Sequence, residues 1–267
     1  MSGYGLKLSE AELNRYALMA KAAAATEADL WAAAGVVEGA VVADVGCGPG
    51  AMSAVLGRLV GPAGRVIAVD QDPEAVETAR ATVAGAGLQN VSVRVGDALS
   101  TGIEDVSVDV VMIRHVLAHN GPSAGKIVAH AASLVRPGGS VYLVDAEITG
   151  LRIRPEDPDL ADLSDRYREW HEQRGNDLSI GLRLGELLAS AGLDPVDHQG
   201  RYQIVTLPPG LRSPPWAARE ALVAAGVATA LDVERWNAAF ERVDRAEPRP
   251  TMFAPLFFAL GRRSATA

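Results

Sequence analysis

Residues 41–50 have the sequence VVADVGCGPG, an apolar run that ends in three glycines at alternate positions. The next ten residues, AMSAVLGRLV (51–60), carry apolar side chains at helical spacing. This order predicts a strand, a tight turn and a helix, and the glycines let a ligand approach the backbone without a Cβ in the way. The free N–H groups at the start of the helix could bind that ligand. A glycine-rich turn can also connect a strand to a helix without binding any ligand, so the neighbouring sequence is needed to distinguish these two possibilities.

The sequence on both sides of this turn alternates between strand and helix patterns. Four further strands are predicted in the first 150 residues: RVIAVD (65–70), VSVRVGD (91–97), VDVVMIRHVL (108–117) and SVYLVDAE (140–147). Helical patterns separate them, as in PEAVETARATVAGAG (73–87) and GKIVAHAASLV (125–135). Such alternation predicts parallel strands joined by right-handed crossovers. With RYQIVTL (201–207) and TMFAPLFFALGRR (251–263), we expect an α/β fold with a seven-stranded, mostly parallel sheet and helices on both faces.

Segments that interrupt the alternation divide the chain into four parts. Residues 1–35, alanine-rich from residue 10, are expected to form an N-terminal helical segment, and residues 36–150 are expected to contain the first five strands. Residues 151–182 are charged and contain prolines, which favours a helical insertion, or lid, over the carboxyl edge of the sheet. Residues 183–267 resume the sheet pattern and contain a second helical insertion at about 214–247.

The composition narrows the classes of function. The 267 residues are 48% hydrophobic and 22% charged, which is ordinary for a globular protein. A net charge of −8 disfavours nucleic acid and anionic membranes as partners, so we expect a small-molecule substrate, while a homodimer remains open. No apolar stretch reaches transmembrane length and the start lacks a secretory pattern, so a cytoplasmic location is expected. Cys47 is the single cysteine, and five scattered histidines without a close acidic cluster predict no metal site.

Acidic residues follow three of the predicted strands or end them. Asp70 ends RVIAVD, twenty residues beyond Gly50, where a carboxylate can accept both ribose hydroxyls of an adenosine. That arrangement fits NAD and S-adenosylmethionine equally. Three local features favour S-adenosylmethionine over NAD: Asp44 inside the loop, the GxGxG rather than GxGxxG spacing, and the acidic turn VGDA (95–98). In this order the features resemble motifs I, II and III of class I S-adenosylmethionine-dependent methyltransferases, and LVRPGG (134–139) before the fifth strand is also typical of them.

This resemblance covers about residues 30–150 and implies a Rossmann-like fold that binds S-adenosylmethionine. It implies that Asp44 lies beside the amino-acid end of the cofactor, that Asp70 holds the ribose and that Asp97 binds the adenine. The cofactor-binding residues expected in all are Asp44, Gly46, Gly48, Gly50, Asp70, Gln71, Asp97, Ala98, Arg114, Arg15 and Tyr16.

The segment that contains Arg15 and Tyr16 folds, by the resemblance, over the methionine end of the cofactor. A guanidinium there suits a carboxylate, although a solvated helix face is the alternative. Outside residues 30–150 the chain is similar to methyltransferases of ubiquinone and menaquinone biosynthesis and their natural-product relatives. RYALMA (15–20) and GLRLGELLASAGL (181–193) carry this second resemblance.

Two histidines are candidates for catalysis because they lie at the end of the fourth predicted strand or just after it, at the edge of the sheet where open α/β sheets bind ligands. His119 could accept a proton from an acceptor hydroxyl or amine, and His115 lies four residues before it. The alternative for His119 is a histidine at a helix start without a catalytic role. For Cys47, packing among the glycines is the preferred interpretation.

The first insertion supplies most of the candidates for substrate binding. Tyr167, Trp170 and His171 could cover a flat apolar substrate, or they could only pack the lid onto the sheet. Glu147, at the end of the fifth predicted strand, is a further candidate.

The implied reaction is direct displacement, in which an oxygen, nitrogen or carbon atom of a small molecule attacks the sulfonium methyl group. Positioning alone can contribute about 7–11 kcal/mol to such a reaction, so few chemical residues are needed. A nicotinamide-dependent oxidoreductase is the main alternative, but the sequence has no Tyr-x-x-x-Lys pair and its only lysines are Lys7, Lys21 and Lys126. A third possibility is a cyclase or regulator that binds the cofactor without transferring its methyl group.

Overall fold

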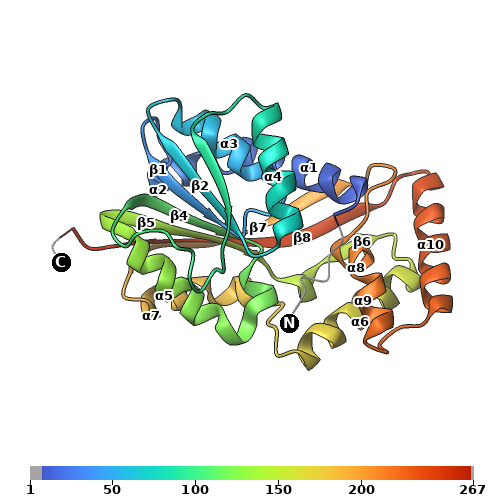
Figure 1. Ribbon diagram of the computed structural model, residues 1–267. Coiled ribbons are helices and arrows are strands. Elements are labelled where there is room, and N and C mark those ends of the chain that lie inside the picture. Colours follow the sequence, from blue (N-terminus) through green and yellow to red (C-terminus); the bar gives the residue numbers. More distant parts are fainter. Residues whose placement is uncertain (1–7, 266–267) are drawn as a thin grey trace.

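The computed structural model describes residues 8–265, and its centre is an eight-stranded sheet in the order β3-β2-β1-β4-β5-β8-β6, with β7 paired to β8 (Figure 1). Strands β1 to β5 are parallel, whereas β8 runs antiparallel to β5, β6 and β7. The strands are β1 (Val41–Val45), β2 (Arg65–Asp70), β3 (Val91–Val95), β4 (Val108–Arg114), β5 (Val135–Ala146), β6 (Arg152–Arg154), β7 (Asp194–Thr206) and β8 (Thr251–Arg262). The α/β prediction and the mostly parallel sheet are confirmed.

The sheet has one strand more than the sequence indicated, and the reason lies in the length of β8. Residues 256–262 of β8 pair with β5, which leaves residues 251–253 of the same edge without a partner from β5. The short strand β6 pairs there, although it belongs to the segment 151–182 that we expected to be helical throughout. Its three residues are too few to show a strand pattern in the sequence.

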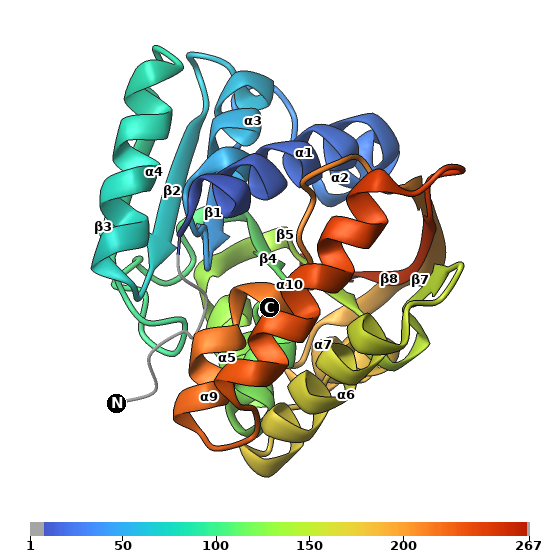
Figure 2. The ribbon, with the colours of Figure 1, turned by 90° about the vertical axis from the view of Figure 1, so that its right-hand side faces the viewer.

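Helices cover both faces of the sheet (Figures 1 and 2). On one face lie α1 (Glu10–Thr26), α2 (Ala28–Ala34), α3 (Ala51–Val60) and α4 (Pro73–Gly85), and on the other α5 (Ala124–Leu134) and α7 (Leu184–Ser190). Local signals start two of them: the Ser9 side chain caps α1, and Asp72 caps α4 ahead of Pro73. Residues 1–7 of the predicted N-terminal segment and residues 266–267 of the predicted C-terminal segment lie outside the described residues.

The remaining helices pack together at one end of the molecule (Figure 1). They are α6 (Pro158–Gln173) from the first insertion and α8 (Pro214–Ala217), α9 (Arg219–Ala224) and α10 (Ala230–Arg245) from the second. We call these four helices the lid. Three short 3₁₀ segments connect other elements: η1 (Leu117–Ser123) lies between β4 and α5, η2 (Ile148–Gly150) between β5 and β6, and η3 (Ile180–Arg183) between α6 and α7. The buried Trp236 of α10 and Leu163 of α6 belong to the same hydrophobic cluster as the residues of β4 and α5, so the lid shares the main core.

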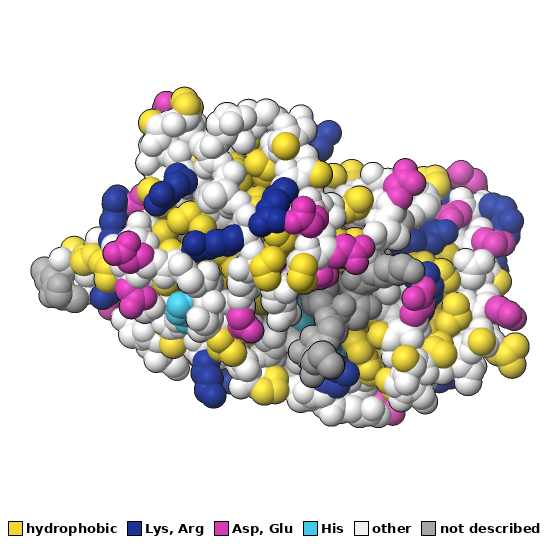
Figure 3. Space-filling model, in the orientation of Figure 1, with side chains coloured by type: hydrophobic (Ala, Val, Ile, Leu, Met, Phe, Trp, Pro, Cys, Tyr) yellow, Lys and Arg dark blue, Asp and Glu magenta, His cyan; other side chains and the backbone are white. Residues whose placement is uncertain are grey.

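The surface carries acidic and basic side chains interspersed on the face that Figure 3 shows. Within residues 8–265, no helix combines the length and the apolar character needed to cross a membrane.

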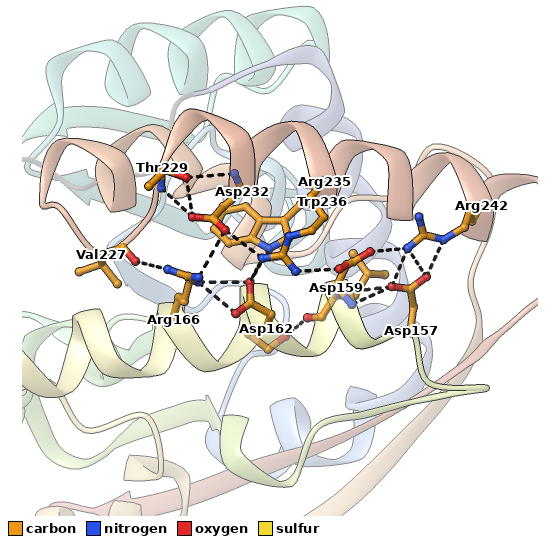
Figure 4. Close-up of polar contacts among 12 residues, drawn as sticks. Asp157, Asp159, Asp162, Arg166, Val227, Thr229, Asp232, Arg235, Trp236 and Arg242 are labelled. Atoms are coloured by element: carbon orange, nitrogen blue, oxygen red, sulfur yellow. Dashed lines mark hydrogen bonds and ion pairs between the residues drawn. The ribbon is translucent and has the colours of Figure 1, made fainter.

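Ion pairs join α6 to α10 across the lid (Figure 4). Arg235 lies 2.7 Å from Asp159, 2.6 Å from Asp162 and 2.9 Å from Asp232. Arg242 contacts Asp157 and Asp159, and Arg166 contacts Asp162 and Asp232. The indole N–H of Trp236 donates to Asp162 at 2.9 Å. We call this set of residues the lid network.

Candidate functional site

The turn between β1 and α3 requires its glycines. Gly46, Gly48 and Gly50 have φ angles of +77°, +53° and +81°, in the region that side chains disfavour. A Cβ on Gly46 would overlap Val116, and one on Gly50 would lie 2.8 Å from the Cβ of Ala79. At Gly48 the nearest atom would belong to the Tyr16 ring, at 3.4 Å. The turn therefore exposes backbone between β1 and an aromatic side chain of α1.

Two carboxylates from adjacent strands lie beside this turn. Asp70, the last residue of β2, accepts the N–H of Gly48 at 2.8 Å and that of Asp72 at 3.0 Å, and burial raises its pKa. Asp44 in β1 is 2% exposed and accepts the hydroxyl hydrogen of Ser53 at 2.6 Å. Burial is the main reason that the pKa of Asp44 is raised to about 6; the Ser53 hydrogen bond and the Arg114 charge oppose this shift, and the Asp70 charge adds to it. Asp44 is thus a buried carboxyl with a pKa of about 6, and among the described residues no basic side chain forms an ion pair with it.

The third predicted acid completes a row along the sheet edge. Asp97 follows β3, is exposed, and accepts the N–H of Leu99 at 2.7 Å. The apolar side chains of Val95 and Leu99 beside it are 52% and 41% exposed, which leaves them available to a flat ring. Ala98 is half-buried at the same turn. Since β3, β2 and β1 are neighbours, the three acids occur in the order Asp97, Asp70 and Asp44 at their carboxyl ends.

The structure gives Arg114 a different neighbour from the cofactor that we expected. Its guanidinium forms a two-pronged ion pair with Glu27 between α1 and α2, at 2.6 and 3.0 Å, and Glu27 is fully buried. Glu27 also accepts hydrogen bonds from Trp31 at 3.2 Å and Tyr142 at 2.9 Å. Arg114 therefore attaches the N-terminal helices to the sheet. Gln71, another expected cofactor residue, is exposed beside Asp70.

Arg15 and Tyr16 do not form a solvated helix face. The Arg15 side chain is 12% exposed and pairs with Glu12 of the same helix at 2.6 Å, and Glu12 is itself buried. The half-buried Tyr16 ring lies against Gly48. Sequence reasoning missed Glu12, because an acid in the first turn of a helix is ordinarily exposed there.

His115 and a buried acid meet where β4 and β5 end. His115 has φ +56°, rare for a residue with a side chain, and its N–H donates to the carbonyl of Val144 at 2.8 Å. Its Nδ1 lies 4.0 Å from Asp145, which is 2% exposed and accepts the N–H groups of Ala118 and Ala146. Burial raises the pKa of Asp145 to about 7. Sequence reasoning overlooked Asp145 in favour of Glu147, although the break in the apolar run VYLVDA was a usable signal.

Glu147 itself is engaged locally after β5. Its carboxylate accepts the hydroxyl of Ser179 at 3.1 Å and that of Thr149. The structure thus gives it neighbours on η2 and before η3.

The lid brings its aromatic residues to His119. The rings of His119 and His171 are 5.0 Å apart, and His171 packs edge-on against Tyr167 at 4.4 Å and Trp170 at 4.7 Å. Burial lowers the pKa of His119 to about 4 and that of His171 to about 3, so both rings are neutral at pH 7. The positive charge of Arg15 adds to the shift at His119. His119, a candidate for catalysis, and His171, a candidate for substrate binding, are therefore neighbours although they are 52 residues apart in the sequence.

Cys47 packs against Ala68 and Ala79, and burial raises the pKa of its thiol, as expected for a residue that fills space. Among residues 8–265, no three histidine, cysteine, aspartate or glutamate side chains are grouped so that they could hold a metal ion.

Comparisons with known proteins agree with this architecture. Residues 42–139 match the family model of a methyltransferase domain, a stretch that contains the glycine turn and all of Asp44, Asp70, Asp97 and His119. The chain is 35% identical over 150 residues to an uncharacterized 37.1 kDa protein in transposon TN4556 of Streptomyces fradiae, covering 56% of this chain and 42% of that protein. It is 27% identical over 188 residues to a demethylmenaquinone methyltransferase of Lactococcus lactis, covering 64% and 74%.

The chain thus spans less than half the length of the Streptomyces protein. Among solved structures, a putative methyltransferase of Bacillus halodurans superimposes with a TM-score of 0.57 at 20% identity, over 90% of this chain and 99% of the other. At this identity the likeness shows the fold.

Proposed function

We propose that this chain, whose residues 42–139 match the family model of a methyltransferase domain, transfers the methyl group of S-adenosylmethionine to a small molecule. The observation that carries the proposal is the row of Asp97, Asp70 and Asp44, one at the carboxyl end of each of three neighbouring parallel strands, around a glycine turn. Ligands of open α/β sheets bind at this edge. S-adenosylmethionine is the cofactor expected of this family, and its adenine, ribose and amino-acid parts need three such sites in series.

The residues present fit that cofactor. Asp70 already accepts two backbone N–H groups, which fixes its carboxylate while leaving lone pairs for ribose hydroxyls. Asp44, buried beside the neutral Ser53, would gain from a cationic amino group. Asp97, with Val95 and Leu99 on either side, offers a hydrogen-bond acceptor between apolar side chains, as an adenine requires.

The bound cofactor would supply an electrophilic methyl group on a sulfonium, and one bond from acceptor to methyl carbon forms as the carbon–sulfur bond breaks. The protein would contribute alignment and exclusion of water, which can account for about 7–11 kcal/mol. The lid residues Trp170 and Tyr167 would cover the acceptor, and His119 would take up its proton and pass it on to solvent. Because the pKa of His119 is lowered to about 4, it suits an acceptor whose hydroxyl is already acidic.

A small acceptor fits the charge of the molecule better than nucleic acid. The net charge is −8, and the face in Figure 3 mixes both signs instead of presenting a basic surface.

Titration calorimetry with S-adenosylhomocysteine and NAD tests the proposal. S-adenosylhomocysteine should bind, and Asp70→Asn should weaken it about 10- to 150-fold, the range for a hydrogen bond to a charged group. Asp72→Asn is the matched control, because asparagine keeps the cap of α4 and the side chain is at the same turn. Binding of NAD but not S-adenosylhomocysteine would overturn the proposal, and an unchanged affinity in Asp70→Asn would place the ribose elsewhere.

A further inference from the structure

Among the residues that the structure describes, two buried polar atoms in the lid have no hydrogen-bond partner. They are the Tyr167 hydroxyl and Nε2 of His171, on residues that are 1% and 4% exposed. The residues are one helical turn apart on α6, and their rings are in edge contact at 4.4 Å. An unmet buried donor or acceptor costs about 1–3 kcal/mol, so a native pair of them indicates a partner that arrives with a ligand.

Both atoms are hydrogen-bond donors. The amide nitrogen of Asn176 donates to Nδ1 of His171 at 2.8 Å, which leaves the ring hydrogen on Nε2. Burial lowers the pKa of His171 to about 3, so the ring is neutral, and burial raises the pKa of Tyr167, so its hydroxyl stays protonated. Together they present one N–H and one O–H without a net charge.

The pair faces the end of the sheet where the glycine turn lies. The charges that act on the Tyr167 hydroxyl come from Arg15, Tyr16 and Glu12 of α1 and from Asp145 at the end of β5. Tyr16 in turn lies against Gly48, and His171 lies against His119 beyond β4. The two residues therefore lie on the side of α6 that faces the sheet, where His171 contacts His119 and Tyr167 is buried in the main core.

The surroundings select for a flat ligand with an electron-rich oxygen. The Trp170 ring lies 4.7 Å from His171 and provides an apolar wall. Arg15 is the largest single charge that acts on the Tyr167 hydroxyl, where it opposes the burial effect, and smaller opposite effects come from Asp145, Tyr16 and Glu12. An amine hydrogen would face two donors, whereas an oxygen with free lone pairs accepts from both, and a negatively charged oxygen accepts more strongly.

We propose that Tyr167 and His171 bind the oxygen of a phenolic or enolic methyl acceptor through their O–H and N–H groups, and that the acceptor binds there as its anion. This rests on the proposed function, and it excludes amines as the preferred acceptors. On binding, the acceptor hydroxyl releases its proton to solvent, and its oxygen lone pair is then available to form the bond to the methyl carbon as the carbon–sulfur bond breaks. Two donors and a planar wall also explain why α6 buries Tyr167 and Trp170 beside a histidine.

The test uses 4-nitrophenol and 4-nitroaniline, which share shape and ring but differ in the group that meets the donors. The protein is first titrated with S-adenosylhomocysteine, and the saturated complex is then titrated with each probe, with absorbance showing whether 4-nitrophenol is bound as its phenolate. We expect phenolate at a pH where the free probe is mostly neutral, and at least tenfold weaker binding of 4-nitroaniline.

Variants complete the experiment. Tyr167→Phe should lower the phenolate affinity about ten- to hundredfold and leave the protein at least as stable, because it removes a buried hydroxyl without a partner. Tyr142→Phe is the control: its hydroxyl donates to Glu27, so it should lose stability and keep phenolate binding.

Failure of S-adenosylhomocysteine to bind would count against the proposed function. If it binds but both probes bind equally, neither binds, or 4-nitrophenol binds as its neutral form, the two-donor site is wrong.

Discussion

The acidic side chains at the carboxyl edge of the sheet and those of the lid have opposite electrostatic surroundings. At the sheet edge, burial raises the pKa of Asp44 to about 6 and that of Asp145 to about 7. In the lid, hydrogen bonds from Thr229 and Arg235 lower the pKa of Asp232 to about 2 (Figure 4). A carboxylate that is already paired with a guanidinium is stabilised little by a cationic ligand. A buried carboxylate beside a neutral hydroxyl is stabilised much more by the same ligand. The contrast separates acids that are available to bind from acids that hold the lid.

Glu27 combines the two situations, because it is fully buried and also paired. Its carboxylate meets Arg114, Trp31 and Tyr142, so three donors replace the water it has lost. Such a network contributes little net stability over apolar packing, but it is costly to break on one side. The lid network has more ion pairs, yet most of its arginines are half exposed, with Arg235 at 40%.

The largest expected effect is therefore at Glu27. Glu27→Gln keeps the shape of the side chain but leaves the Arg114 charge buried without a counter-charge, and should lower the free energy of unfolding by about 3–5 kcal/mol. Urea denaturation followed by circular dichroism measures it. Glu38→Gln, an exposed acid just beyond α2, should change nothing measurable.

The double variant Glu27→Gln/Arg114→Met sharpens this prediction. Removing both charges should recover part of the loss, since the buried unpaired charge is gone. A loss of less than 1 kcal/mol in the single variant, or no recovery in the double, would show that Glu27 and Arg114 do not depend on one another.

The next effect is a pH dependence of cofactor affinity set by Asp44. Its pKa is about 6 in the folded protein against 3.8 ordinarily, so the folded state holds this proton more tightly than the unfolded state. The contribution of Asp44 to the free energy of unfolding is therefore fully present below about pH 4 and is lost as the pH rises through 6. A cationic amino group of the cofactor needs the ionised form, so affinity should rise about tenfold per pH unit below 6 and level off above 7.

Calorimetry with S-adenosylhomocysteine from pH 5 to 8 measures this profile. Asp44→Asn should bind more weakly and without this slope, because asparagine accepts the Ser53 hydroxyl but carries no charge. A flat profile in the unmodified protein would remove Asp44 from contact with the amino group.

The sequence allowed the glycine turn and its acids to be predicted because the signals are local. The apolar run to Val45, the alternate glycines and Asp70 at a strand end are all contained in one βαβ unit. Glu27 and Arg114 are 87 residues apart, and nothing in either neighbourhood indicates the other. The meeting of His119 and His171 depends on how the lid packs, and packing between distant segments leaves no periodic trace.

Strand β6 shows the same limit for the fold. Its residues Arg152–Arg154 pair with β8 because β8 extends beyond β5, which is a property of another part of the chain. Asp145 could have been identified as a candidate, because a charged residue inside VYLVDA, which is otherwise buried, has to be satisfied by the fold. The local half of the candidate site was thus open to sequence reasoning, and the lid half was not.

The smallest effect is expected in the lid network, at Arg235. Arg235 contacts Asp159, Asp162 and Asp232, but it is 40% exposed, and each exposed pair is worth only about 0.2–1 kcal/mol. Arg235→Gln should therefore lower the free energy of unfolding by about 1 kcal/mol in low salt. In about 1 M salt the screening length falls to about 3 Å, so the difference in free energy of unfolding between Arg235→Gln and the unmodified protein should shrink, while the loss in Glu27→Gln should persist.

Arg168→Gln is the matched control in the lid. It removes a single exposed ion pair, with Asp165 of the same helix α6, and should have no measurable effect. Urea denaturation of the three variants at both salt concentrations compares the networks directly. A loss at Arg235 as large and as insensitive to salt as that at Glu27 would mean that the lid network acts as a buried one, and that exposure does not distinguish the two regions.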